Sequence, residues 1–252
     1  MGTNPRRCDS DVVGNVFVNS SQWRIARIGG DGSGNSMGRF RFVNNTMILD
    51  PMSTSAIALQ LTVSTLEMYN NVIMAPMAGV TVYDIDDETG PPAVFFGSNN
   101  WLVTGMTSIP TPWTRTLMGA DPGFVDPANH DLRPTPTSPL VGQGTTDTAA
   151  TGALAFVNPL ELPAFDPPER RLIPVGSAEA RTFTGNPSVG AFEPTAAAPG
   201  PAPPGPGTPP TLKGGSGSGC KCRMSQEPGD ASSWLAGVSL VAFALARRRR
   251  RC

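Results

Sequence analysis

A short phrase, a pair of Asn or a Gly-Asn pair followed by apolar residues, occurs four times in the first 103 residues. The four copies are Gly14-Asn15-Val16, Asn44-Asn45-Thr46, Asn70-Asn71-Val72 and Asn99-Asn100-Trp101. The second Asn therefore recurs at intervals of 30, 26 and 29 residues. A period of this length favours a stack of repeated units over a globule with a single irregular core.

Each copy of the phrase predicts a bend between two short strands. Asn tolerates a left-handed backbone and bonds to neighbouring amides, so it suits a sharp bend. The residues that follow are β-branched or bulky, and Phe40-Arg41-Phe42-Val43 before the second copy alternates as a strand does. If the units stack at about 4.8 Å, equivalent Asn side chains can form a hydrogen-bonded ladder.

These features predict an all-β fold, a right-handed parallel β-helix solenoid. Its expected parts are β-helix turns in 1–119, a Pro-rich closing segment in 120–193, a disordered linker in 194–219, and a sorting signal with a short hydrophobic helix in 220–252. The alternative is an antiparallel β-sandwich in which the Asn pairs recur by chance. Because the first repeat begins at once and no apolar signal sequence precedes it, we expect further turns and a signal upstream of Met1.

Charge and cysteine content argue against a nucleic-acid partner and against a disulfide-stabilised fold. Residues 1–212 contain 11 Arg, no Lys and 18 Asp or Glu, and so acidic a body argues against nucleic acid as a partner. Cys8 is the one cysteine before the tail, so the body has no internal disulfide framework.

The densest acidic cluster contains Asp84, Asp86, Asp87 and Glu88. Carboxylates in a loop can hold Ca²⁺, and paired carboxylates can catalyse glycoside hydrolysis. A turn follows the cluster, however, and such acids are usually solvated, so they are weak calcium candidates and we predict neither a cofactor nor a catalytic residue. His130, the one histidine, is expected in a surface turn.

The tail carries the clearest functional signal. Cys220-Lys221-Cys222 precedes an apolar run from Trp234 to Ala246, and Arg247–Arg251 follow. The run is shorter than the roughly 20 residues of a stable membrane span, and the arginines favour a cytoplasmic end. These features together predict a sorting signal.

Two resemblances follow from these motifs. Residues 220–252 resemble the tripartite myxobacterial C-terminal sorting signal, MYXO-CTERM. That resemblance implies Cys220 or Cys222 as the processing and lipid-attachment site. Residues 11–193 resemble right-handed parallel β-helix proteins of the pectate-lyase-like superfamily. In particular, Asp121-Pro122-Gly123-Phe124, Ser138-Pro139-Leu140 and Val189-Gly190-Ala191-Phe192-Glu193 resemble the end of choice-of-anchor Q domains.

Two functions are compatible with these resemblances. The first is a non-catalytic protein, structural, adhesive or glycan-binding, exported and anchored at the cell surface or outer membrane after a transient inner-membrane span. Its partners would be the membrane, the sorting machinery and polysaccharide. The second is a secreted polysaccharide lyase or glycoside hydrolase whose site lies in further N-terminal turns. Arg24, Arg27, Arg39 and Arg41 could line a substrate face, but outward arginines on such strands are usually solvated, so we favour the non-catalytic function.

Overall fold

A computed structural model describes residues 9–18, 23–29, 38–60, 63–86, 92–156, 159–168 and 172–194. Within these residues the chain is built from strands, turns and one short 3₁₀ helix, η2 (Pro127–Asn129). The all-β prediction is confirmed for this part of the chain.

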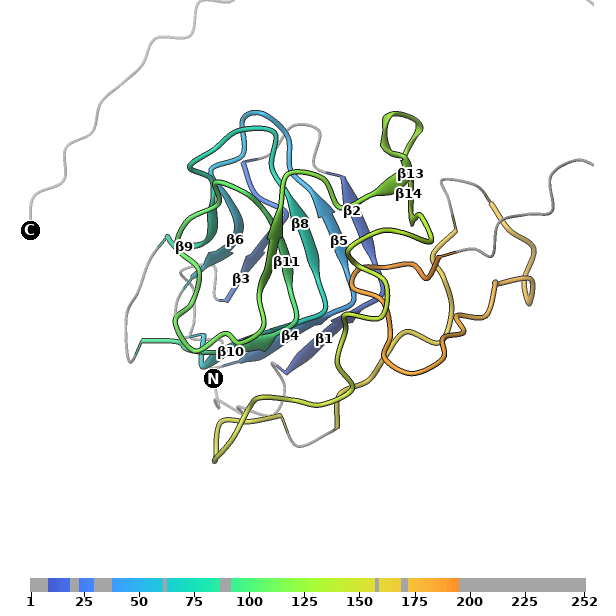
Figure 1. The fold of residues 1–252 in the computed structure, drawn as a ribbon. Helices are drawn as coiled ribbons and strands as arrows, with labels where there is room; N and C mark the ends of the chain where they lie inside the picture. The colour runs from blue at the N-terminus through green and yellow to red at the C-terminus, as the bar shows by residue number, and fades with distance from the viewer. Residues whose placement is uncertain are drawn as a thin grey trace, which may run out of the picture. The chain divides into compact units, whose positions relative to one another are not determined.

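The strands of the repeats form three parallel sheets (Figure 1). Sheet A contains β1 (Ser10–Val13), β4 (Arg39–Val43), β7 (Thr65–Tyr69) and β10 (Val94–Ser98). Sheet B contains β2 (Val16–Val18), β5 (Thr46–Ile48), β8 (Val72–Met74), β11 (Trp101–Val103) and β12 (Leu117–Gly119). Sheet C contains β3 (Ala26–Ile28), β6 (Ser55–Leu59) and β9 (Thr81–Ile85).

Each of the first three repeats contributes one strand to each sheet, always in the order A, B, C. Equivalent residues pair in register, so that Phe42 lies beside Met68 in sheet A and Met47 beside Ile73 in sheet B. The side chains between the three sheets form one core, in which Met47, Leu66, Met68 and Ile73 are fully buried. The alternative of an antiparallel sandwich is wrong, because every strand pair among the repeats is parallel.

Two features of the array were not predicted. The first is the third strand of the later repeats, because no sequence motif marked β6 or β9. The second is a partial fifth turn. Thr107 bridges to Thr81 and so completes the fourth turn in sheet C, and residues 114–119 then begin a fifth turn, in which Thr114 bridges to Ser98 and β12 pairs with β11. This turn carries no Asn pair, so it lacks the phrase that marks the other four.

The segment after β12 forms a second apolar layer against the outer face of sheet B. The hairpin of β13 (Phe124–Asp126) and β14 (Asp131–Pro134) is antiparallel. Apolar residues from this segment pack against Val72 and Trp101; they are Phe124, Leu132, Leu140, Val189, Ala191 and Phe192. We expected the segment to close the end of the array, whereas these contacts lie along its side (Figure 1).

Candidate functional site: a polar seam and a charged face

The bend between sheets A and B has the predicted left-handed backbone. Asn44, Asn70 and Asn99 have φ angles of 52°, 57° and 56°, and Gly14 has 69° at the equivalent position. A positive φ is tolerated by Asn and Gly at low cost. The first residue of each pair therefore makes the bend, and the second can bond to its equivalents.

The second Asn of each pair forms the predicted ladder. The backbone N–H of Asn15 donates to Oδ1 of Asn45 at 2.9 Å, that of Asn45 to Oδ1 of Asn71 at 3.0 Å, and that of Asn71 to Oδ1 of Asn100 at 3.0 Å. The same Oδ1 atoms also accept from the side-chain Nδ2 of the preceding Asn. The ladder thus satisfies buried amides that the sharp bend leaves outside the strand pairing.

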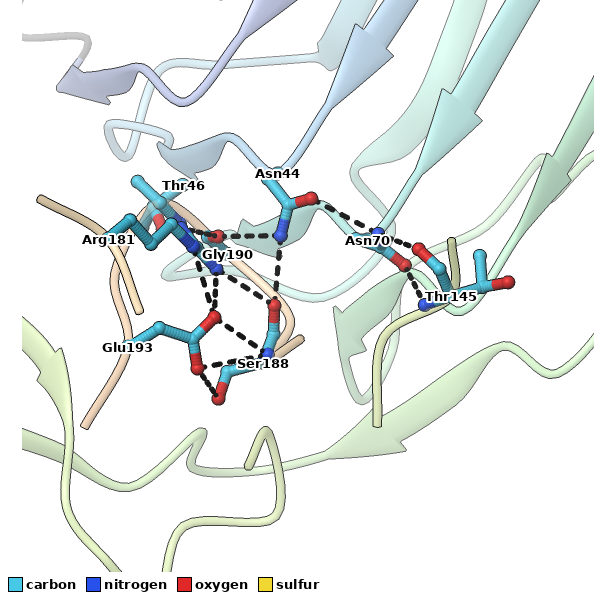
Figure 2. Close-up of polar contacts among 9 residues, drawn as sticks. Asn44, Thr46, Asn70, Thr145, Arg181, Ser188, Gly190 and Glu193 are labelled. Carbon is cyan, nitrogen blue, oxygen red and sulfur yellow. Dashed lines mark hydrogen bonds and ion pairs between the residues drawn. The ribbon is translucent and has the colours of Figure 1, made fainter. Parts of the chain in front are cut away.

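The first Asn of each pair binds the C-terminal segment. Nδ2 of Asn44 donates to the carbonyl oxygens of Ser188 and Gly190 at 2.9 and 3.1 Å (Figure 2). Asn70 exchanges hydrogen bonds with the backbone of Thr145, and Nδ2 of Asn99 donates to the carbonyl of Gln143. Successive repeats therefore present a seam of amides on which residues 143–145 and 188–190 are fixed.

A buried ion pair organises that contact. Glu193 accepts from Arg181 at 2.7 Å and from the backbone N–H of Ser188 at 3.0 Å, and Arg181 also donates to the carbonyls of Ser188 and Gly190 (Figure 2). The Arg181 side chain is 0% exposed. We call Arg181, Ser188, Gly190 and Glu193 the C-terminal polar cluster. Burial lowers the pKa of Arg181, and the nearby Glu193 carboxylate opposes this shift.

Gly190 is required at the contact for a steric reason. Its φ of 98° is in the region that favours glycine. A Cβ atom there would lie 2.9 Å from Oγ1 of Thr46 and 3.0 Å from Cγ2 of Val72. The glycine of the Val189-Gly190-Ala191 motif therefore lets the backbone approach sheet B closely, with Ala191 N–H donating to Thr46 Oγ1.

The outer face of sheet A is covered, which corrects the expectation that its arginines are solvated. Arg41 is 1% exposed, pairs with Asp11 and donates to the carbonyl of Pro159. Its guanidinium lies 4.4 Å from the centroid of the Phe156 ring. Arg39 pairs with Asp9 and donates to the Ala155 carbonyl.

Glu67 is fully buried beside this cover. It accepts from the backbone N–H of Phe156 and from the Tyr69 hydroxyl, both at 3.3 Å. Burial raises the pKa of Glu67, and it raises the pKa of Tyr69 to about 12. Glu67 is out of contact with solvent, so the rise in its pKa is a consequence of burial. A substrate could not reach this carboxyl group.

Sheet C, like sheet A, carries charged side chains on its outer face, and these include a half-exposed arginine. Arg27, Ala58 and Asp84 share one row by register, and the side chain of Arg27 is 53% exposed. Arg24 binds both Asp84 (2.9 Å) and Asp86 (2.6 Å), and Arg27 binds Asp86 (2.7 Å). We call Arg24, Arg27, Asp84 and Asp86 the charged face; the yellow and orange trace of the C-terminal segment lies away from β3, β6 and β9 (Figure 1).

The weak calcium candidates lie partly on this charged face. Asp84 and Asp86 bind arginines, and Asp87 and Glu88 lie outside the described residues. Where the structure describes the chain, no group of three His, Cys, Asp or Glu side chains could hold a metal ion. Two expectations change: Asp84 and Asp86 are paired rather than only solvated, and the Arg24 side chain is mostly buried in its ion pairs rather than solvated.

Trp23 lies next to the charged face in the chain and was not singled out from the sequence. The residue as a whole is 60% exposed. The Trp23 carbonyl accepts from the backbone N–H of Thr54 at 3.0 Å, which fixes this residue at the start of β6. Arg24, the next residue in the chain, binds Asp84 and Asp86. An exposed aromatic ring together with guanidinium and carboxylate groups can offer stacking and directed hydrogen bonds to one ligand.

His130 lies in a turn, as predicted. It follows η2, has a φ of 64°, and its backbone N–H donates to the Pro127 carbonyl. The side chain lines a hollow of about 420 Å³ with Asn15, Val16, Val18, Pro167, Pro168 and Phe192. The hollow was not predicted, because it joins residues from the two ends of the described chain.

Asp166 gives a pH-dependence prediction for the C-terminal segment. Burial raises its pKa to about 6, Arg181 opposes the shift, and Glu179 and Glu193 reinforce it. Because the folded-state pKa exceeds the ordinary value of 3.8, the favourable contribution is full below about pH 4 and is lost as pH rises through 6. Asp166→Asn is therefore expected to stabilise the protein at pH 7.5 and to be neutral at pH 4 in urea denaturation. A stabilisation of equal size at both pH values would contradict this assignment.

The predicted sorting signal, including Cys220, Cys222 and the apolar run, lies outside the described residues. Within those described, no helix has the length and hydropathy needed to cross a bilayer. Comparison with known proteins gives no match: neither a protein-family model, nor a curated protein, nor a solved structure is similar to this chain.

Proposed function

We propose that this chain is an exported, surface-anchored protein in which a right-handed parallel β-helix serves as a non-catalytic, polysaccharide-binding scaffold. The fold assignment is supported by three parallel sheets that successive repeats visit in the same order. The Asp121, Ser138 and Val189 motifs, which resemble choice-of-anchor Q domains, all contribute to the layer on sheet B.

The non-catalytic part of the proposal rests on the buried polar side chains, which bond to one another and to the backbone. Arg41 and Arg181 pair with carboxylates and backbone carbonyls in buried positions, and Asn45, Asn71 and Asn100 bond to one another. Catalytic acids and bases must be within hydrogen-bond reach of a substrate, and these groups are enclosed by the protein. Their arrangement supports a rigid scaffold.

The charged face and Trp23 support polysaccharide as the ligand. A sugar ring has an apolar face that can stack on the indole, and its hydroxyls can donate to Asp84 or accept from the half-exposed Arg27. The parallel strands beneath fix these groups in space, so little conformational entropy is lost on binding.

Binding can be tested by affinity electrophoresis of the full chain through gels containing neutral or acidic polysaccharides. Trp23→Ala and Arg27→Ala are expected to weaken retention about tenfold each, the effect typical of an exposed anchor residue. Met118→Ala, which truncates another half-exposed apolar residue on β12, is the matched control and should bind as the wild type does. Retention that is equal in all four proteins would contradict the assignment of this face.

The anchor makes a separate prediction. Replacing both Cys220 and Cys222 with Ala is expected to abolish surface labelling of cells that express the protein, because the thiol needed for processing and lipid attachment is removed. The ladder and the C-terminal polar cluster contain neither residue, so the thermal unfolding of the purified variant should be unchanged. Surface labelling at the wild-type level would contradict the sorting function of these cysteines.

A further inference from the structure

The first repeat is less buried than its equivalents. Asn15 is exposed, whereas Asn45, Asn71 and Asn100 are fully buried. Phe17 is partly buried, although its register partner Met47 is fully buried. The apolar and polar positions of the repeat are thus the same in β2 as elsewhere, but one side of this strand remains accessible.

On the accessible side of β2, in the part of the chain that the structure describes, the Asn ladder ends without a donor to its last Oδ1 atom. At each step, Oδ1 of one Asn accepts from the backbone N–H and Nδ2 of the Asn before it. Among the described residues, no donor of this kind reaches Oδ1 of Asn15, and β1, β2 and β3 are end strands of their sheets. End strands present backbone N–H and C=O groups that can pair with another strand.

The hollow beside β2 extends this edge. Val16 and Val18, two residues apart, line it together with Phe192 and the rings of Pro167 and Pro168. In sheet B, Val16 is in register with Thr46, and Val18 with Ile48. A further strand added parallel to β2 would continue the rows of Val16 and Val18. Its side chains in these two rows would therefore lie beside the hollow.

We infer that this edge binds a polypeptide segment that supplies one further repeat unit. The segment would add a parallel strand to β2, following an Asn-Asn or Gly-Asn bend. The backbone N–H of its second Asn would donate to Oδ1 of Asn15, and its two alternate apolar side chains would enter the hollow. In such strand addition, main-chain hydrogen bonds give affinity and side-chain pockets give specificity.

The probe is a fluorescent synthetic peptide with the sequence of residues 40–49, which contains both strands and the bend of the second repeat. Titrated with the full chain in detergent, it is expected to bind and to slow amide hydrogen exchange in residues 9–18. Val18→Lys places a charge in the hollow, and Asn15→Ala removes the acceptor. Each variant should weaken binding at least about tenfold.

Two controls show whether the edge at β2 itself accounts for the binding. Val125→Ala, at an exposed residue of β13, should bind the peptide as the wild type does, and circular dichroism should show that all variants are folded. Equal affinity for wild type and variants, or protection confined to other strands, would overturn the inference. So would sedimentation showing a dimer that Val18→Lys dissociates, because the edge would then bind a second copy of this chain.

Discussion

Replacing Asn71 with Leu is expected to lower the free energy of unfolding by roughly 3–5 kcal/mol. Asn71 is fully buried, and its Oδ1 accepts from both the backbone N–H and Nδ2 of Asn45. Its Nδ2 donates to the carbonyls of Phe42 and Tyr69 and to Oδ1 of Asn100. Leucine leaves the backbone N–H of Asn45 buried without its acceptor and takes one partner from each of the other groups, although the Tyr69 carbonyl still accepts from Asn44 N–H and Oδ1 of Asn100 still accepts from the residue 71 N–H. A buried group without a partner costs about 1–3 kcal/mol.

The matched control is Asn15→Leu, at the exposed end of the same ladder. Water can replace the lost side chain there, so we expect a loss below about 1 kcal/mol. Urea denaturation monitored by far-ultraviolet circular dichroism measures both variants. Equal losses would show that position in the ladder does not matter, and an unchanged midpoint for Asn71→Leu would contradict the stacked register itself.

Arg181→Met is expected to be the second largest perturbation, with a loss of about 3–5 kcal/mol. The substitution keeps a long side chain but leaves the Glu193 carboxylate without its guanidinium, and it removes donors from the carbonyls of Ser188 and Gly190. Because this cluster holds the chain on Asn44, limited proteolysis should cut residues 172–194 while the repeat array remains resistant.

Arg133→Met is the control for the loss of an ion pair as such. Arg133 pairs with Asp131 two residues away, and the pair is partly exposed. Pairs of this kind contribute about 0–1 kcal/mol. If both arginine variants lost the same stability, or if cleavage in Arg181→Met began within the repeats, the C-terminal polar cluster would not have the role given to it.

The ladder could be predicted from the sequence because it depends on one residue type at a nearly constant period. The bend at Asn44 and Asn70, the strands beside it and the pairing of Asn45 with Asn71 all follow from local chemistry repeated in register. The partial fifth turn at 114–119 lacks the Asn pair, so the same pattern does not mark it.

The position of the C-terminal segment could not be predicted, because it depends on contacts between residues far apart in the chain. Asn44 donates to Gly190, 146 residues later, and Arg41 donates to Pro159, 118 residues later. No periodicity relates these segments. The burial of Arg41 was missed for this reason, since its strand alone has the alternation of a strand with a solvated face.

The charged face was less predictable than the ladder but more predictable than the position of the C-terminal segment. Arg24 and Asp84 are 60 residues apart, and an alignment of the repeats places Arg27, Ala58 and Asp84 in one row. The arginines and the acids were separate candidates at the level of sequence, because the third strand of the repeat was not aligned. Ala58 is the informative residue, since its small side chain lies between Arg27 and Asp84 in the row.

The length of a bound polysaccharide after incubation with the full chain tests the central claim most directly. The polysaccharide that retards the protein in affinity electrophoresis is incubated with the protein in solution. The mixture is then separated by size-exclusion chromatography and assayed for new reducing ends. A non-catalytic scaffold predicts that the polysaccharide elutes with the protein at unchanged length. Shortened chains that disappear when Asp84 or Asp86 is replaced by Asn would contradict the non-catalytic function and would make the charged face a hydrolytic site.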